Sequence, residues 1–375
     1  MPFSKGYSGI DRVLHHVAFS LPLVQRTLSD LENDLYRREL ESVVSRDEVF
    51  VTGLPRAGTT LVLELLYGTG EFATFTYRDM PFILAPLLWR RFSQSSRRQG
   101  TRAERAHGDG VEVSYDSPEA FEEVAWLAWL GEHILREHTL APLAPESVTP
   151  EAASALRMFV RKRLLASSQE AGGANLRYLS KNNANISRLG ALGRLFPTAR
   201  VLVVFRDPLA QVNSLMAAHH RFLKEHAEDR FSERYMRWIG HYDFGANFRP
   251  IDFSGRWRAD GPPREPDAGF WLQYWTAAYG HVLAAGSPQV RLVDFDRLCR
   301  EPVIALQRLG EQAGVRDVAQ LASAAGTLRK ARSHPLSADA VSRPVLEAAQ
   351  EIHRKLQEAA ASEQPLPATR AAQGV

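Results

Sequence analysis

Cysteine is almost absent from this chain of 375 residues, which contains Cys299 alone. A single cysteine excludes a disulfide bond within the chain and any metal site built from several cysteines. The H-E-x-x-H motif of zinc proteases and the G-x-S-x-G motif of serine hydrolases are missing as well. We therefore expect no bound metal and neither of these two kinds of hydrolysis.

Long apolar runs and a strong charge of one sign are also missing. Residues 17–24 are too few and too interrupted to form the core of a signal peptide, and no segment is long enough to span a membrane. The net charge is only +3, and no basic run is interleaved with aromatic residues. We expect a cytoplasmic protein that binds no nucleic acid and has no integral membrane segment.

Hydrophobic residues make up 45% of the chain, enough for a large core, and their spacing alternates between strand and helix patterns. Buried-strand patterns occur at 48–52, 177–180, 200–205 and 290–295. Helical patterns occur at 9–45, 59–67, 121–130, 150–170, 185–196, 209–220 and 302–314. This alternation predicts an α/β fold with a mostly parallel sheet and helices on both faces.

The simplest organisation is one domain over residues 1–358. Within it we expect N-terminal helices at 1–45, an α/β core at 46–314 and an aromatic-rich helical cap at 215–285. The last residues, 359–375, turn to alanine, glutamine, proline and serine, which is typical of a flexible tail.

The first chemical motif is the loop that follows the strand at 48–52. It reads Gly53, Leu54, Pro55, Arg56, Ala57, Gly58, Thr59 and Thr60. A loop that leads from a strand into a helix presents backbone N–H groups and the positive end of the helix dipole, which together hold a phosphate.

The same loop differs from the P-loop of ATPases, G-x-x-x-x-G-K-[ST]. Gly53 and Gly58 have the P-loop spacing, but Thr59 stands where the P-loop lysine belongs. Without that lysine the loop is poorly suited to γ-phosphate chemistry with magnesium. It suits a phosphate that is bound but does not react.

The loop resembles the 5′-phosphosulfate-binding loop of the sulfotransferases that use 3′-phosphoadenosine 5′-phosphosulfate (PAPS). In that family a lysine or arginine, a small residue, glycine and two threonines follow a strand, and the arginine form is similar to the tyrosylprotein and carbohydrate sulfotransferases. The resemblance implies a P-loop-like, nucleotide-kinase-like fold. It also implies that residues from Pro55 to Thr60 bind PAPS as co-substrate, without a metal.

Two further segments strengthen this resemblance. Arg206 ends a buried strand and Ser214 follows eight residues later, as in the family's motif for the 3′-phosphate. Lys181 follows the strand at 177–180, where the family places a lysine that neutralises charge on the sulfuryl oxygens or the leaving phosphate. Arg56 would supply a second charge there.

The late part of the chain matches the family less well. Phe295 and Asp296 replace a tyrosine and a glutamate of the family's late segment, for which we expect an architectural role. The basic residues Arg329, Lys330 and Arg332 are the candidates for a C-terminal segment that closes over the 3′-phosphate, but the expected glycines are missing.

Two residues are candidates for the base that takes the proton of the acceptor. Asp79 is the carboxylate in the region where carbohydrate and tyrosylprotein sulfotransferases carry theirs, with Arg78 beside it as a competing ion-pair partner. His107 has Asp109 two residues on and is the competing base. His219 and His220 follow Ser214 along a helix and are weaker candidates.

The sequence therefore predicts transfer of a sulfuryl group from PAPS to a hydroxyl or amine by in-line displacement. One alternative is a P-loop-type kinase or NTPase that uses ATP, and another is a non-catalytic protein that binds phosphoadenosine nucleotides. The acceptor is open among small molecules, saccharides and lipids. The aromatic cap favours a partly apolar or ring-containing acceptor, although core packing explains the same residues.

Overall fold

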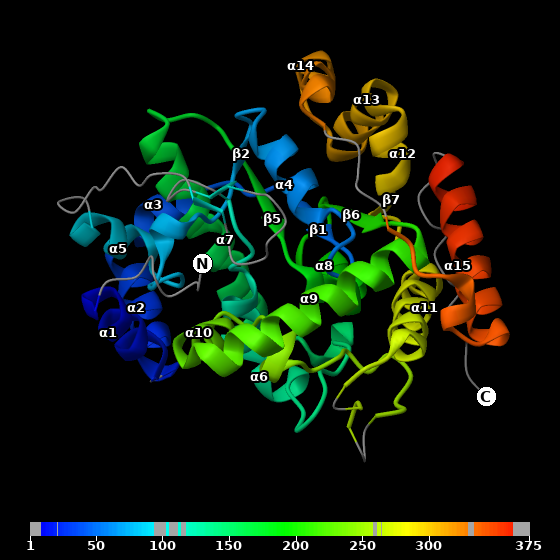
Figure 1. Ribbon diagram of the computed structural model, residues 1–375. Coiled ribbons are helices and arrows are strands. Elements are labelled where there is room, and N and C mark those ends of the chain that lie inside the picture. Colours follow the sequence, from blue (N-terminus) through cyan, green and yellow to red (C-terminus); the bar gives the residue numbers. More distant parts are fainter. Residues whose placement is uncertain are drawn as a thin grey trace, which may run out of the picture.

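The computed structural model describes residues 9–20, 22–93, 103–104, 112–113, 118–257, 261–263, 265–328 and 334–362. Its centre is a five-stranded sheet in the order β2-β5-β1-β6-β7, and every pairing in it is parallel (Figure 1). The strands are β1 (Val49–Thr52), β2 (Phe72–Ala73), β5 (Arg177–Lys181), β6 (Arg200–Phe205) and β7 (Val290–Asp294). A separate antiparallel pair consists of β3 (Ala103–Glu104) and β4 (Glu112–Val113).

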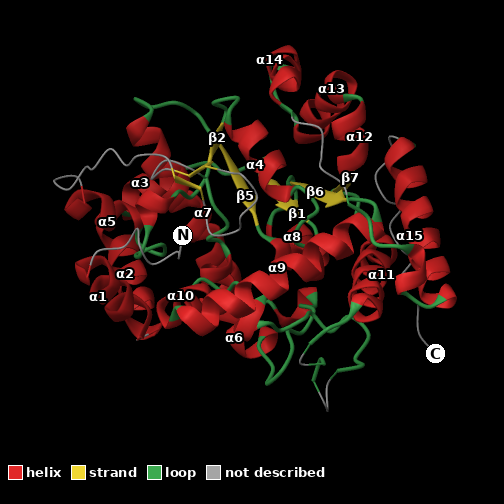
Figure 2. Ribbon diagram, in the orientation of Figure 1, coloured by secondary structure: helices red, strands yellow, loops and turns green. Residues whose placement is uncertain are grey.

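Helices cover both faces of the sheet because successive strand residues point to opposite sides. Val49 and Val51 belong to one core, whereas Phe50 belongs to the other. The first core is completed by α4 (Thr59–Tyr67), α12 (Phe295–Arg300), α13 (Pro302–Ala313) and α14 (Val318–Ser323). The second is completed by α6 (Glu123–Ile134), α7 (Pro150–Glu170), α8 (Leu189–Leu195), α9 (Pro208–Glu228), α11 (Ala268–Ala285) and α15 (Arg343–Ala361). Figure 2 shows this helical cover around the strands, which confirms the predicted α/β fold.

The N-terminal layer consists of three helices. They are α1 (Gly9–Ser20), α2 (Pro22–Leu35) and α3 (Arg37–Ser42), and Pro22 stands at the first position of α2, where its fixed φ angle and missing N–H are favourable. Lys162 of α7 attaches this layer, since its Nζ donates to the carbonyl of Ser29 over 2.8 Å and lies 3.8 Å from Glu32 Oε1. Near it lies α5 (Pro86–Ser93), whose Leu88 N–H donates to Glu32.

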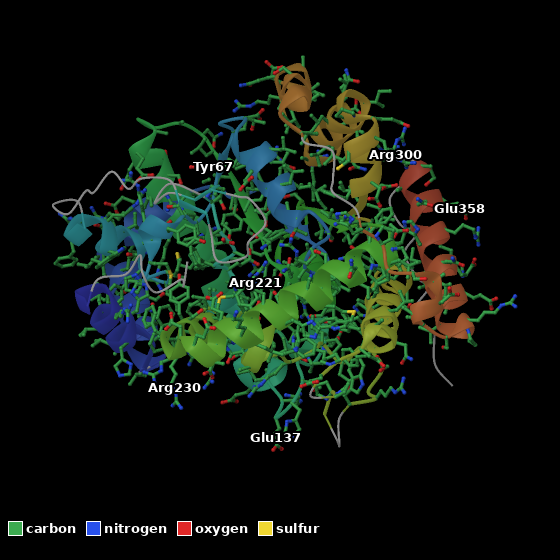
Figure 3. The ribbon with its side chains drawn as sticks, in the orientation of Figure 1. Tyr67, Glu137, Arg221, Arg230, Arg300 and Glu358 are labelled. Atoms are coloured by element: carbon green, nitrogen blue, oxygen red, sulfur yellow. The ribbon has the colours of Figure 1, made fainter. Side chains whose placement is uncertain are left out.

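The cap consists of the outer part of α9, α10 (Arg230–Trp238), the short helix η6 (Gly245–Asn247) and α11. Helix α9 continues to Glu228, beyond the expected end near residue 220. Aromatic rings fill the cap; for example, the ring centroids of Phe248 and Trp271 lie 4.9 Å apart. Charged side chains such as Glu137, Arg230 and Glu358 lie at the periphery (Figure 3). At the other end of the chain, α15 extends to Ala361, past the expected start of the tail at residue 359.

Two buried histidines of α9 hold η6 in place. The backbone N–H of Gly245 donates to His219 Nδ1 over 3.3 Å, and that of Ala246 donates to His226 Nδ1 over 3.1 Å. Burial lowers the pKa of His219 from 6.5 to about 4, and burial also lowers the pKa of His226. Both rings must remain neutral at Nδ1 for these two hydrogen bonds to exist.

We therefore expect the free energy of unfolding to fall as the pH drops from about 6.5 towards 4, because the unfolded chain then binds protons that the buried rings cannot. Urea denaturation of the protein at pH 7 and pH 5 measures this loss. The double variant His219→Asn/His226→Asn, whose amide oxygens take the position of Nδ1 and accept the same bonds without titrating, is the matched control. It should lose less stability between the two pH values, and an equal loss would assign the effect to other groups.

Candidate active site

The loop between β1 and α4 depends on two glycines with positive φ angles. Gly53 has a φ of 147°, and a Cβ there would lie 2.3 Å from the carbonyl oxygen of Val204 in β6. Gly58 has a φ of 98°, and a Cβ there would lie 2.1 Å from the ring of Phe295. Arg56 also has a positive φ, 67°, a region that only glycine adopts freely. The loop therefore packs so tightly against β6 and Phe295 that no side chain fits at Gly53 or Gly58.

Three adjacent strands end at the same edge of the sheet and carry the charged residues of the site. Strand β1 lies between β5 and β6, with Val51 paired to Lys181 and Thr52 paired to Val203. Ligands bind at such carboxyl edges of open parallel sheets. One cavity opens there, and its lining includes the predicted residues Pro55, Arg56, Gly58, Thr59, Thr60, Lys181 and Arg206.

The two predicted phosphate motifs touch each other. The Nε of Arg56, in the loop, donates to Ser214 Oγ of α9 over 3.0 Å. Ser214 is thus placed beside the loop, although it does not line the cavity. Ala57 of the loop is fully buried and does not line the cavity either. The two motifs are far apart in the sequence, but they meet because β1 pairs with β6 and α9 directly follows β6.

Arg206 is a buried cation with an unused donor. Its Nε has no hydrogen-bond partner among the described residues and lies 3.8 Å from Asp296 Oδ1. Its guanidinium carbon lies 5.4 Å from the centre of the Phe295 ring. Because buried donors are nearly always satisfied in proteins, this one fits a site for an anion. Asp296 itself accepts the Asp207 N–H over 2.6 Å, in agreement with the architectural role expected for this segment.

The segment that carries Lys181 is held by hydrogen bonds on all sides. Lys181 Nζ lies 4.0 Å from Oε1 of the buried Glu119. The next residue, Asn182, donates to Glu123 Oε2 over 2.7 Å. Asn183 accepts from Thr59 Oγ1 over 3.3 Å and donates to Asp243 Oδ2 over 3.3 Å. The lysine therefore sits on a rigid segment that is joined to the first loop.

Gln211 is a positioning residue that the sequence did not single out. It is fully buried in α9, and its Nε2 donates to the carbonyls of Leu54 and Pro55 over 3.2 and 2.9 Å. Its Oε1 accepts from Trp275 Nε1 over 2.9 Å. A helical glutamine near an aromatic segment is too common a pattern to reveal such a role.

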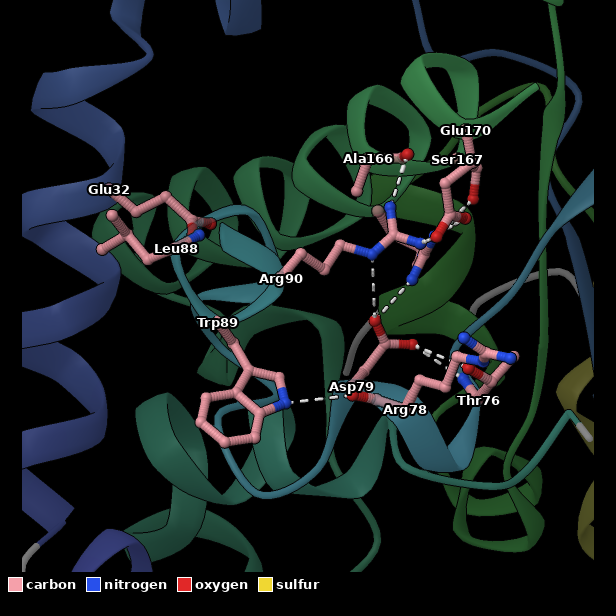
Figure 4. A network of polar contacts seen from close by, with 11 residues as sticks. Glu32, Thr76, Arg78, Asp79, Leu88, Trp89, Arg90, Ala166, Ser167 and Glu170 are labelled. Atoms are coloured by element: carbon pink, nitrogen blue, oxygen red, sulfur yellow. Dashed lines mark hydrogen bonds and ion pairs between the residues drawn. The ribbon is translucent and has the colours of Figure 1, made fainter. Parts of the chain in front are cut away.

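Asp79 lies outside the cavity, in a buried polar network of its own (Figure 4). Its Oδ1 accepts from Arg163 Nη1 over 2.6 Å and lies 3.9 Å from Arg90 Nε. Its Oδ2 accepts the backbone N–H of Thr76 over 2.8 Å, which caps the short helix η2 (Tyr77–Asp79). With both oxygens engaged, the side chain is placed to join η2 to α7 and α5 rather than to take a proton from an acceptor.

We expect Asp79→Ala to lower the free energy of unfolding by about 3 kcal/mol, because it removes the buried carboxylate that pairs with Arg163 and leaves that cation only the partly exposed Glu170. The folded fraction should keep its affinity for nucleotide and its turnover number, since the cavity is untouched. Denaturant unfolding together with active-site-normalised kinetics measures both quantities. If Asp79→Ala had normal stability but no turnover, Asp79 would have to be a catalytic residue.

His219 and His220 lie in α9, and neither is among the residues that line the cavity. The remaining sequence candidates fall outside the described residues. These are His107 and the C-terminal basic residues Arg329, Lys330 and Arg332. Among the residues that the structure adds to the cavity lining are His241 and Asp243, which follow α10 in the cap. Neither has a distinctive sequence signal, because they lie in an aromatic segment far from both phosphate motifs.

The far wall of the cavity is aromatic. Its lining includes Tyr242, Phe244, Phe248, Trp271 and Tyr274. The cavity wall therefore combines cationic residues from the sheet edge with aromatic residues from the cap. Among the described residues, no helix combines the length and apolar character needed to cross a membrane.

The chain is similar to known proteins in sequence pattern and in fold. The model of the family described as "Sulfotransferase family" matches residues 48–257. The solved structure of the sulfotransferase STF9 from Mycobacterium avium is 14% identical, has a TM-score of 0.53 and is matched over 96% of this chain and 88% of its own. The sulfotransferase STF1 from Mycobacterium tuberculosis is 17% identical with a TM-score of 0.41, over 88% of this chain and 82% of its own.

These comparisons support different conclusions. No curated protein matches the chain in sequence. At 14% identity, the likeness to STF9 shows a shared fold. The family model, in contrast, covers more than half of the chain, including β1, the loop after it, Lys181, Arg206 and the start of the cap. The chain therefore belongs to the sulfotransferase family.

Proposed function

We propose that this protein transfers the sulfuryl group of PAPS to a hydroxyl or amine of a small-molecule acceptor. The observation that carries the proposal is the buried Arg206, whose Nε lacks a hydrogen-bond partner among the described residues. It lies at the sheet edge with the loop from Pro55 to Thr60, where Arg56 and Ser214 are joined. A cation with a spare donor beside a helix N-terminus suits a ligand with two separate phosphate groups.

When bound, PAPS would supply an activated sulfuryl group. The backbone of the loop and the hydroxyls of Thr59 and Thr60 would hold the 5′ side, while Arg206 and Ser214 would hold the 3′-phosphate. Arg56 and Lys181 would stabilise negative charge at the reacting end. Since these side chains provide the positive charge, the proposal includes no metal.

The acceptor would lie against the aromatic residues of the cavity. Rings such as Phe248 and Trp271 line it, together with Leu140 and Ile251. This wall favours a hydroxyl compound with an apolar or ring-containing body, because buried apolar area supplies most of the binding free energy of such ligands. A saccharide or lipid with an apolar part fits the same chemistry.

The kinase alternative is disfavoured by the first loop. Thr59 begins α4 at the position of the P-loop lysine, and its Oγ1 donates to Asn183. The family to which the chain belongs is also a sulfotransferase family. No observation favours ATP as the substrate.

Isothermal titration calorimetry with 3′-phosphoadenosine 5′-phosphate (PAP) tests the proposal, with ATP and magnesium as the comparator. We expect micromolar binding of PAP and at least about tenfold weaker binding of ATP, a difference of about 1.4 kcal/mol. Stronger binding of ATP than of PAP, or no binding of either, would contradict the proposal.

A further inference from the structure

The cap contributes one imidazole to the cavity. His241 follows α10, and of the described residues that line the cavity it is the one histidine. Neither its sequence context nor the family model assigns it a role. Its position on the cavity wall with Lys181 and Asn183 raises the question of what its ring can do there.

The loop that carries His241 is fixed. The backbone N–H of His241 donates to the carbonyl oxygen of Met236 over 2.9 Å. The backbone N–H of Arg249 donates to the carbonyl oxygen of Tyr242, also over 2.9 Å. Gly240 packs so closely on α6 that a Cβ there would lie 2.5 Å from Glu123 Cγ. A side chain on such a loop keeps one position, which is what a proton-transfer group needs.

One hydrogen bond sets the tautomer of the ring. His241 Nε2 lies 3.0 Å from the carbonyl oxygen of Ala120. A carbonyl oxygen only accepts hydrogen bonds, so Nε2 carries the proton. In the neutral ring the lone pair is then on Nδ1, which becomes the atom able to accept a proton.

We propose that His241 is the general base of the reaction and that its Nδ1 takes the proton of the acceptor hydroxyl. This inference rests on the proposed function. The O–H bond of the acceptor breaks, its electron pair stays on the oxygen, and an N–H bond forms at Nδ1. The ring becomes an imidazolium, stabilised by the Ala120 carbonyl at Nε2, and later returns the proton to water.

The charges around His241 are compatible with this role. Glu119, Lys181 and Asp243 are the titratable groups that act on it, from the segment before α6, from β5 and from its own loop. Burial lowers the pKa of the ring, Glu119 opposes this effect, and Lys181 adds to it. The ring is therefore neutral at pH 7, as a base must be before it acts.

Asp243 is the carboxylate among the described residues that line the cavity, and it is the weaker candidate for the base. Its Oδ2 already accepts from Asn183 Nδ2 over 3.3 Å. We assign Asp243 the role of positioning Asn183.

Nitrogen NMR of the histidine rings tests the geometry without any donor present. Long-range ¹H–¹⁵N spectra of the ¹⁵N-labelled protein, with His241→Gln to assign the signal, report both the tautomer and the pKa. We expect the Nε2–H tautomer and a pKa below the ordinary 6.5. An Nδ1–H tautomer, or a ring that is charged at pH 7, would overturn the proposal.

Kinetics of matched variants tests the role itself. We expect His241→Gln to lower kcat by about 100-fold or more, as loss of a general base does, and to abolish the fall in rate at acid pH. Asp243→Asn should lower kcat less than tenfold. A large loss in Asp243→Asn with little loss in His241→Gln would assign the base to Asp243.

Calorimetry with PAP separates this inference from the proposed function. Both variants should bind PAP as the wild type does, because neither residue belongs to the phosphate-binding residues. If the wild type binds PAP and transfers sulfuryl groups while His241→Gln is fully active, the base assignment alone fails. If the wild type does not bind PAP, the proposed function fails.

Discussion

Replacing Arg206 by alanine is expected to remove most of the preference of the protein for a 3′-phosphate. The wild type should bind PAP more tightly than adenosine 5′-phosphate, which lacks that group. In the variant the two affinities should be much closer, because only Ser214 remains to hold the 3′-phosphate. The expected loss for PAP is about 10- to 100-fold, because a hydrogen bond to a charged group contributes about 1.5–3 kcal/mol. Calorimetric titration of both nucleotides into both proteins gives the four constants needed.

The reason lies in the surroundings of Arg206. Its side chain is 11% exposed, and Asp296 is 3.8 Å away, too far for a hydrogen bond. Arg343→Ala is the control, because Arg343 is 88% exposed on α15 and its loss changes the net charge equally. A variant that still distinguishes the two nucleotides as the wild type does would show that Arg206 does not bind the 3′-phosphate.

Replacing Gly58 by alanine is the second change with a large expected effect. The added Cβ would lie 2.1 and 2.4 Å from two atoms of the Phe295 ring. Overpacking of this kind costs about 1–3 kcal/mol in stability. The ring cannot move freely, since it begins α12 and lies beneath Arg206. We therefore expect PAP affinity to fall at least about tenfold, a difference of about 1.4 kcal/mol, as the loop and Arg206 are displaced together.

Gly70→Ala is the control that separates the steric clash with Phe295 from the cost of a positive φ angle in a residue other than glycine. Gly70 also has a positive φ, 74°, but no atom lies within 4 Å of a Cβ built there. It should lose stability from the unfavourable φ angle alone and keep its affinity for PAP. Thermal unfolding and calorimetry of both variants measure the difference. Equal behaviour of the two would mean that Phe295 does not constrain the loop.

The sequence predicted four of the five strands of the sheet, all except the short β2, for local reasons. It also singled out Arg206 and the loop after β1, which the structure brings to one cavity. Strand β6 and helix α7 are found where their patterns place them, at Arg200–Phe205 and Pro150–Glu170. Arg206 and Ser214 lie eight residues apart on one strand–helix unit, so their motif can be recognised from the sequence alone. The loop after β1 carries its own glycines and charge.

The rest of the site depends on contacts between distant segments, which no local pattern encodes. Asp79 follows the expected motif position, yet Arg163, 84 residues later, draws it into a buried ion pair. His241 reaches the cavity only because η6 and α10 fold over it, and its tautomer depends on a carbonyl 121 residues away. The cytoplasmic location, the absence of a metal, the extent of the domain and the roles of His107 and the C-terminal basic residues stay predictions.

The measurement that tests the central claim most directly is transfer of ³⁵S from labelled PAPS to a panel of phenols, sterols, saccharides and fatty alcohols, with PAP quantified in each reaction. We predict labelled product and an equal amount of PAP with at least one apolar acceptor. Lys181→Ala, which removes a charge at the reacting end, should abolish both while it still binds PAP. PAP formation at the uncatalysed rate with every acceptor, in a wild-type protein that binds PAP, would contradict the account and indicate a nucleotide-binding protein without transferase activity.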